Sequence, residues 1–213
     1  MTVGFPIIVV IVILVATCLA RLPDAQKRAR ILKRTGFGVM AFITAFFGLF
    51  IVGETFTDPG GWQALGLVAA WAVPLTALAA AAWWRPGWAI RLFTVLIGVV
   101  IGVSVWYALN PEGWQGFEGR HGPIRTIIGF VLAAAVAVLG LQRTAVAGLL
   151  LVLGVVPVIV SSLGGQLGFA SLAVVSAAPL IAGVLYVWSA AVAGRSPPRK
   201  GTHARTEDRS TAA

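Results

Sequence analysis

Acidic residues and one histidine gather in two short polar stretches that separate long apolar runs. Glu54 and Asp58 flank the first stretch, and Glu112, Glu118 and His121 lie in the second. Carboxylate and imidazole groups ligate metals, and the same groups bind a cation, a sugar or a lipid headgroup. The spacing matches no recognised metal motif, and no cofactor is indicated. We therefore treat these five residues as a candidate polar cluster.

The same two stretches have a purely structural explanation. Residues 58–61 read Asp-Pro-Gly-Gly and residues 110–113 read Asn-Pro-Glu-Gly. Both match a type I turn, which favours Asp or Asn first, Pro second and Gly fourth. Trp62 and Trp114 follow directly, and tryptophan concentrates at membrane–water interfaces. Both stretches therefore predict turns between helices as well as a candidate cluster.

The composition indicates that lipid surrounds most of the chain. Hydrophobic residues make up 59% of the 213 residues and charged residues only 11%, with a mean hydropathy of +0.94. Soluble domains carry about 25% charged residues. The net charge of +9 comes from short basic runs between apolar segments, a pattern of membrane topology and not of nucleic-acid binding. Cys18 is the only cysteine, so no disulfide can form within the chain.

Seven apolar runs approach the length of about 20 residues that a membrane-spanning helix needs. They predict an all-α integral membrane protein, with one helical domain over residues 1–193 and a disordered, basic cytoplasmic tail over 194–213. The predicted spans are Gly4–Ala20, Gly36–Gly53, Trp62–Trp84, Trp88–Leu109, Ile124–Leu141, Thr144–Leu163 and Phe169–Ala193. The first could instead be a cleaved signal or a lipid anchor at Cys18, but basic residues follow it, which favours a retained helix.

The basic residues predict the orientation. With seven spans, 14 of the 16 Lys and Arg residues fall on one side of the membrane, and only Arg120 and Arg125 fall on the other. Basic connectors stay in the cytoplasm. We therefore expect a multi-pass protein of the cytoplasmic membrane with its N-terminus outside and its C-terminus inside. The richness in Ala, Gly, Val and Arg resembles that of small multi-pass membrane proteins of bacteria with GC-rich genomes.

A weak internal repeat is a further hypothesis. Arg34, Arg85 and Arg143 each precede small or aromatic residues that open an outward-going helix, and a returning helix follows each time. One leading helix plus three tandem helical hairpins would explain the pattern. The alternative is that basic residues followed by small ones begin many spans by default.

Packing signals and neutral polar residues suggest what the spans could do. Gly98 and Gly102 form a G-x-x-x-G pattern, which lets helices approach closely in lipid. It predicts packing within the bundle, and the alternative is a face between two copies of the chain. Three prolines lie within spans and are expected to kink them: Pro74, Pro157 and Pro179. A solute pathway, if present, would be lined by hydroxyl side chains. The candidates are Thr76, Thr94, Ser104, Ser161, Ser162 and Ser176.

Ionisable groups are missing from the middle of every predicted span, where they would mark proton relays or ion pathways. The three lysines are Lys27, Lys33 and Lys200, so a retinal Schiff base in the last span is excluded. The chain is therefore expected to be a non-enzymatic accessory, packing or lipid-interacting protein, with the bilayer and another membrane protein or itself as partners. The alternatives are a permease for small solutes or lipids and, third, an enzyme acting at the outer surface through the polar cluster.

Overall fold

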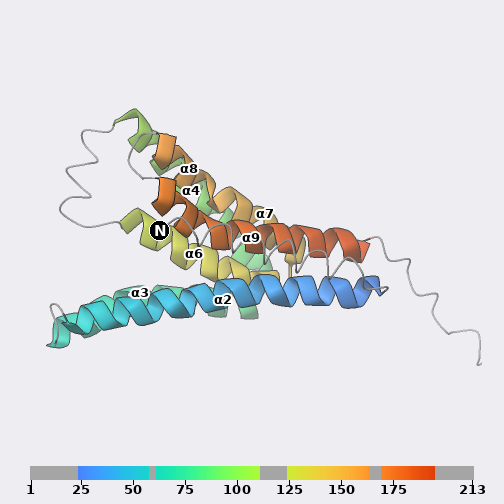
Figure 1. The fold of residues 1–213 in the computed structure, drawn as a ribbon, viewed down its shortest axis with the longest axis horizontal. Coiled ribbons are helices and arrows are strands. Elements are labelled where there is room, and N and C mark those ends of the chain that lie inside the picture. Colours follow the sequence, from blue (N-terminus) through green and yellow to red (C-terminus); the bar gives the residue numbers. More distant parts are fainter. Residues whose placement is uncertain (1–23, 58–60, 111–123, 164–168, 195–213) are drawn as a thin grey trace, which may run out of the picture.

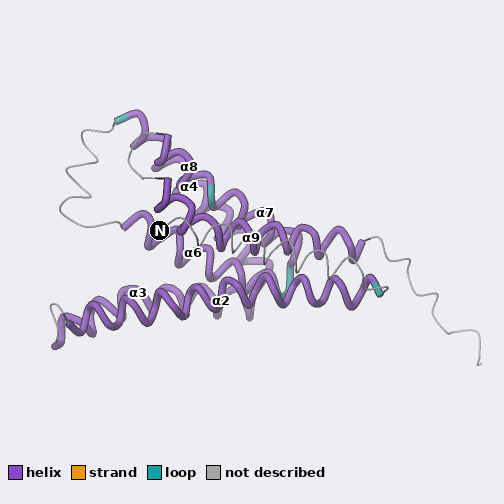
Figure 2. The backbone as a smooth tube through the Cα atoms, viewed as in Figure 1, coloured by secondary structure: helices purple, strands orange, loops and turns teal. Residues whose placement is uncertain are grey.

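The structure, a computed structural model, describes residues 24–57, 61–110, 124–163 and 169–194, and this part of the chain is helical throughout apart from short turns (Figures 1 and 2). The helices are α2 (Ala25–Thr57), α3 (Gly61–Trp84), α4 (Pro86–Leu109), α6 (Ile124–Gly140), α7 (Thr144–Gly154), α8 (Val156–Leu163) and α9 (Phe169–Gly194). The all-helical class is thus confirmed for the described residues. The predicted span at 4–20 and the tail at 195–213 lie outside them.

Four helical stretches in this part of the chain are long and apolar enough to cross a membrane. They are Ala25–Thr57, Gly61–Trp84, Pro86–Trp106 and Ser176–Gly194, and the shorter apolar helices Ile127–Gly140 and Thr144–Gly154 accompany them. These are the helices of a membrane protein. The count of seven crossings and their orientation stay predictions.

Helix α2 begins well before the predicted span at Gly36, because the basic connector is itself helical. The Asp24 carboxylate caps the helix by accepting hydrogen bonds from the backbone N–H groups of Gln26 and Lys27, at 2.9 and 3.3 Å. Ala, Gln, Lys and Arg, which dominate the connector, are good helix formers. The added turns are also packed, since Ala29 and Leu32 are buried against α9. The first turns of α2 are therefore stabilised by a cap and by a packed face.

The predicted span Thr144–Leu163 is interrupted at Val155 and forms the two helices α7 and α8. Pro157 has no N–H and cannot donate to the carbonyl one turn earlier, so the α-helical ladder breaks just before it. Pro74 and Pro179, which were expected to act in the same way, lie inside the continuous helices α3 and α9. Only one of the three prolines therefore separates two helices.

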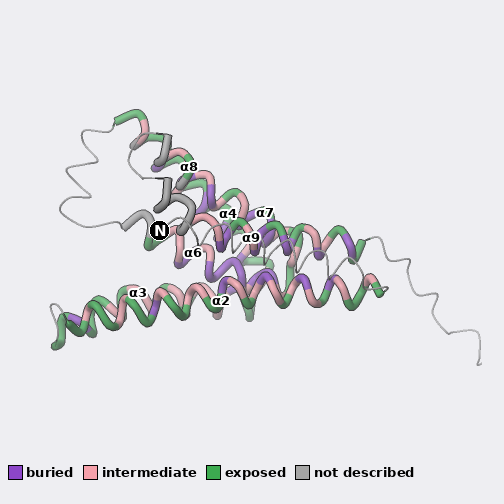
Figure 3. Tube along the Cα trace, in the orientation of Figure 1, coloured by how far each residue is buried: buried purple, intermediate pink, exposed green. Residues whose placement is uncertain are grey.

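The most extensive helix contacts join α2 to α9, α7 to α9 and α3 to α6. In the first two proposed tandem hairpins the paired helices are α2 with α3 and α4 with α6. Each of these pairs shares fewer contacts than the three pairs above. Figure 1 shows α2 and α3 running together and diverging at one end from α4 and α8. Much of α3 and of the Thr57 half of α2 is therefore exposed, as the green segments in Figure 3 show.

The core lies where α2, α6, α7 and α9 meet, and Tyr186 of α9 is its largest fully buried side chain. The Tyr186 hydroxyl donates a 2.7 Å hydrogen bond to the Ala137 carbonyl of α6. Gly36 and Gly140 lie against the ring, and a Cβ at Gly140 would overlap it. The core thus combines one large aromatic ring with glycines that make room for it.

Side-chain contacts bring the basic ends of several helices to one end of the bundle. The Lys33 ammonium of α2 donates to the Leu141 carbonyl after α6, at 3.1 Å. The Gln142 side-chain amide donates to the Trp83 carbonyl near the end of α3, at 2.7 Å. The Ser189 hydroxyl near the end of α9 donates to the Ala29 carbonyl, at 2.8 Å. The start of α2 and the ends of α3, α6 and α9, which the charge pattern assigns to one side of the membrane, therefore lie together. We call this end of the bundle the basic end.

Candidate functional surfaces

The predicted polar cluster is not assembled by the described residues. Glu54 lies exposed near the last turn of α2, while Asp58, Glu112, Glu118 and His121 lie outside the described part of the chain. Within that part, no group of three or more His, Cys, Asp or Glu side chains is placed so that it could hold a metal. The cluster therefore stays a prediction.

Three of the hydroxyl side chains predicted to line a solute pathway bond to their own helices instead. Thr76 donates to the Ala72 carbonyl at 2.8 Å, and Thr94 donates to the Ile90 carbonyl at 2.8 Å. Both residues are exposed, whereas Ser104 is buried and donates to the Val100 carbonyl at 2.7 Å. Hydroxyls often use such bonds in an apolar environment, because the carbonyl one turn earlier is always within reach.

The other three hydroxyl candidates lie on the last two helices. Ser161 and Ser162 belong to α8, and their side chains fall outside the description. Ser176 is partly buried in α9. None of the six predicted residues lines either of the two hollows described next.

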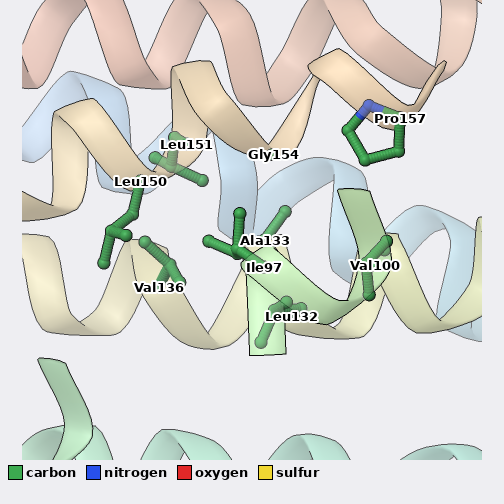
Figure 4. A pocket seen from close by; sticks show the side chains of 10 residues that line it. Ile97, Val100, Leu132, Ala133, Val136, Leu150, Leu151, Gly154 and Pro157 are labelled. Atoms are coloured by element: carbon green, nitrogen blue, oxygen red, sulfur yellow. The ribbon is translucent and has the colours of Figure 1, made fainter. Parts of the chain in front are cut away.

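A small cavity of about 20 Å³ lies beside the break between α7 and α8. Figure 4 shows Ile97 of α4, Val136 of α6, and Leu151 and Pro157 from the two sides of the break around it. A volume of this size holds about one water molecule, which would need several polar partners. The side chains around this cavity are apolar, so it offers a polar solute no side-chain hydrogen-bond partner.

A larger apolar groove of about 610 Å³ runs along α2 and is completed by α3 and α6. Its wall includes Phe37, Thr44 and Gly48 of α2, Trp71 of α3 and Ala137 of α6. The Trp71 ring lies directly against Gly48, where a Cβ would approach a ring carbon to 2.7 Å. The buried Thr44 hydroxyl has no hydrogen-bond partner among the described residues. We call this hollow the α2–α3–α6 groove.

Helix α4 presents Gly98 and Gly102 on its outer face. A Cβ at either position would meet no described atom within 4 Å. Neighbouring valines are exposed as well, with 64% of Val95 and 55% of Val99 accessible. This face, which we call the α4 glycine face, therefore packs against no described helix of the chain.

Other glycines, which sequence reasoning did not single out, carry the close helix contacts. Gly148 of α7 and Gly183 of α9 face each other so closely that a Cβ at Gly148 would lie 2.9 Å from the Gly183 carbonyl oxygen. Neither glycine has a second glycine one turn before it, where Thr144 and Pro179 stand instead, so no G-x-x-x-G pattern marks this contact. The pattern at Gly98 and Gly102 indicates a face suited to close packing, but it does not distinguish the inside of the bundle from the outside.

Comparison with protein-family models finds no match to this chain, and comparisons with curated proteins and with solved structures find none either.

Proposed function

We propose that this chain is a non-enzymatic, multi-pass protein of the cytoplasmic membrane that acts as a packing subunit. Its partner is another membrane protein or a second copy of the chain, and the contact is made by the α4 glycine face. In this proposal the N-terminus lies outside and the C-terminus lies in the cytoplasm, as the distribution of Lys and Arg favours.

The observation that carries the proposal is the contrast between two sets of glycines. At Gly148 and Gly183 this chain uses glycine where two helices cross at close range. Gly98 and Gly102 lie one turn apart on a single helix, but their surface is open among the described residues. Helix association in lipid depends on such close approach, since no hydrophobic force drives it. The α4 glycine face is thus suited to close packing against a helix from outside the described bundle.

Photo-crosslinking in intact cells tests this contact. A photoreactive amino acid at Val99 lies on the α4 glycine face, and the same group at Val73 of α3 is a control on an equally exposed valine, with 55% and 61% accessible. We expect a discrete adduct from Val99 that is absent from Val73. The mass of the adduct distinguishes a second copy from another protein. Equal adduct patterns from both sites would contradict the proposal.

A permease is the second candidate, supported by the break between α7 and α8 beside a cavity. Interrupted helices mark binding sites in many transporters. Against it, that cavity holds only about one water molecule and has an apolar lining, and Thr76 and Thr94 point their hydroxyls at their own helices. Uptake of a neutral solute such as glycerol into proteoliposomes tests this candidate. Uptake above that of protein-free vesicles, lowered by Pro157→Ala, would favour the permease over the packing subunit.

A further inference from the structure

We propose that the α2–α3–α6 groove binds one acyl chain of an anionic phospholipid, whose headgroup lies at the basic end beside Arg30 and Arg34. The site is separate from the α4 glycine face, so it does not depend on the proposed function. The proposal rests on the lining of the groove, on its length and on the positive charges that continue the same face of α2 beyond Phe37. We call the Phe37 end of the groove its mouth.

The groove has the chemistry and the dimensions of an acyl-chain site. Its α2 wall runs from Phe37 to Val52, which corresponds to about 22 Å at a rise of 1.5 Å per residue. One leaflet of the bilayer contributes half of a hydrocarbon core that is about 30 Å thick. A single chain entering from the basic end therefore remains within the groove over its full depth. The hydroxyl of Thr44 is the exception among largely apolar lining groups.

The mouth of the groove is positively charged. Arg30, Lys33 and Arg34 precede Phe37 by seven, four and three residues, spacings that place them on the same face of α2. Arg30 and Arg34 are exposed, and Lys33 is held at the mouth by its hydrogen bond to the Leu141 carbonyl. Exposed Trp83 and Trp84 lie at the same end of α3, and tryptophan favours the headgroup level.

An anionic headgroup is the natural complement, because the one acid that the described part of the chain has at this end already accepts hydrogen bonds as the cap of α2. The acidic residues of the described part are Asp24, which caps α2, and Glu54, which lies near the opposite end of the same helix. Basic residues near a membrane surface attract anionic lipid by about 1 kcal/mol each. A phosphodiester therefore supplies the missing negative charge, while its acyl chain covers the apolar wall.

Two other occupants match the charges less well. The apolar segment at 4–20 contains no acidic residue and is followed by Arg21, so it would cover the wall but add positive charge at the mouth. A second copy inserted in the same orientation would bring its own Arg30 and Arg34 to the same level. Both arrangements place like charges close together, which is unfavourable, whereas a phosphodiester places an opposite charge there.

Fluorescence quenching tests the lipid site, because Trp71 lines the groove. The full-length protein is placed in nanodiscs whose phosphatidylglycerol or phosphatidylcholine carries brominated acyl chains, and the Trp71 signal is taken as the difference from Trp71→Phe. We expect half-maximal quenching at a lower mole fraction of phosphatidylglycerol than of phosphatidylcholine. Arg30→Gln combined with Arg34→Gln should raise that fraction by up to about 25-fold, or about fivefold per residue.

Matched controls make the result decisive. Arg91→Gln removes an exposed charge from α4, away from the groove, and should change the phosphatidylglycerol preference by less than about twofold. Ala45→Trp fills the groove, whereas Ala69→Trp adds the same ring at an exposed position of α3 that does not line it. Native mass spectrometry should show retained phosphatidylglycerol for Ala69→Trp and its loss for Ala45→Trp. Equal quenching by both lipids, or no effect of the double Arg variant, would overturn the proposal.

Oxidative crosslinking identifies the other occupants. Ala41→Cys places a thiol in the groove, and Cys18 is the only native cysteine. With a lipid in the groove we expect no disulfide after mild oxidation. A bond between Cys18 and the introduced thiol of the same chain would assign the groove to the segment at 4–20. A disulfide between two chains would assign it to a second copy, and either bond would overturn the lipid site.

Discussion

Individual glycines and hydroxyls show how this chain meets the demands of an apolar environment. The Tyr186 hydroxyl and the Ser189 hydroxyl each donate to a carbonyl on another helix, at 2.7 and 2.8 Å. Such bonds between helices are worth about 0.6 kcal/mol on average in membrane proteins. Close glycine contacts add to the specificity of these modest bonds, since they decide which helix faces can meet.

Replacing Gly148 with Ala tests the close contact between α7 and α9. The added methyl group would lie 2.9 Å from the Gly183 carbonyl oxygen and 2.9 Å from the Val187 backbone nitrogen. Neither atom belongs to a flexible side chain, so the helices must separate. We expect a loss of about 1–3 kcal/mol in the free energy of unfolding, as for other overpacked sites, measured by denaturation in mixed micelles.

Gly66→Ala is the matched control for Gly148→Ala. It adds the same methyl group to α3 at an exposed position where no described atom lies within 4 Å. Alanine is the better helix former, so the control should be neutral or stabilising by up to about 1 kcal/mol. Equal losses in both variants would show that the Gly148–Gly183 contact is not what the mutation disturbs.

At the scale of the elements, α2 is the helix that organises the chain. It is capped by Asp24, packs on α9 through its first turns and forms one wall of the apolar groove further along. Its early start follows from ordinary helix chemistry. A Lys or Arg side chain that reaches solvent does not oppose helix formation. The Asp24 carboxylate accepts hydrogen bonds from backbone N–H groups of the first turn, which would otherwise lack a partner within the helix.

Removing the cap should loosen the start of α2. Asp24→Ala leaves the Gln26 and Lys27 N–H groups without the carboxylate that accepts from them. The loss of an N-cap costs about 1 kcal/mol, so amide hydrogen exchange in the first turn should accelerate by about fivefold. Asp24→Asn keeps a capping oxygen and should exchange nearly as the original chain does. Unchanged exchange in Asp24→Ala would show that packing on α9 alone fixes the helix start.

The helices could be predicted because hydrophobic run length is a direct signal, and six of the seven predicted segments coincide with helices in the described part of the chain. The extension of α2 was missed because its charged residues were interpreted as topology signals alone. All three spans carry a proline, but only Pro157 has a glycine, Gly154, three residues before it, which predicts a loosened helix there. The helix breaks at Val155, while α3 and α9 stay intact around Pro74 and Pro179. The inward-facing glycines could not be predicted, because they depend on which distant helices meet. Gly148 of α7 and Gly183 of α9 are an example, since they lie on different helices and face each other.

At the scale of the whole molecule, charge distribution and packing agree. The hydrogen bonds of Lys33, Gln142 and Ser189 tie together helix ends that lie far apart in the sequence. All of these ends belong to the side to which the charge pattern assigns most of the Lys and Arg residues. The described basic segments therefore lie at one end of the bundle. This arrangement is consistent with the tendency of basic connectors to stay on the cytoplasmic side.

Labelling of single cysteines measures the orientation directly. In a Cys18→Ser variant, Thr57→Cys marks the end of α2 and Thr202→Cys marks the C-terminal tail. We expect an impermeant maleimide to label the thiol at position 57 in intact cells and the thiol at position 202 only after the membrane is opened. Labelling of both in intact cells, or the reverse order, would contradict an outer Thr57 and a cytoplasmic C-terminus.

The mass of the particle extracted directly into native nanodiscs tests the packing-subunit proposal most simply. A single chain has a mass of 22.2 kDa, and we predict a larger particle of discrete composition for the original protein. Gly98→Leu combined with Gly102→Leu should return a single chain, because the leucines block close approach at the α4 glycine face. Recovery of the original protein as a lone chain would contradict the proposal.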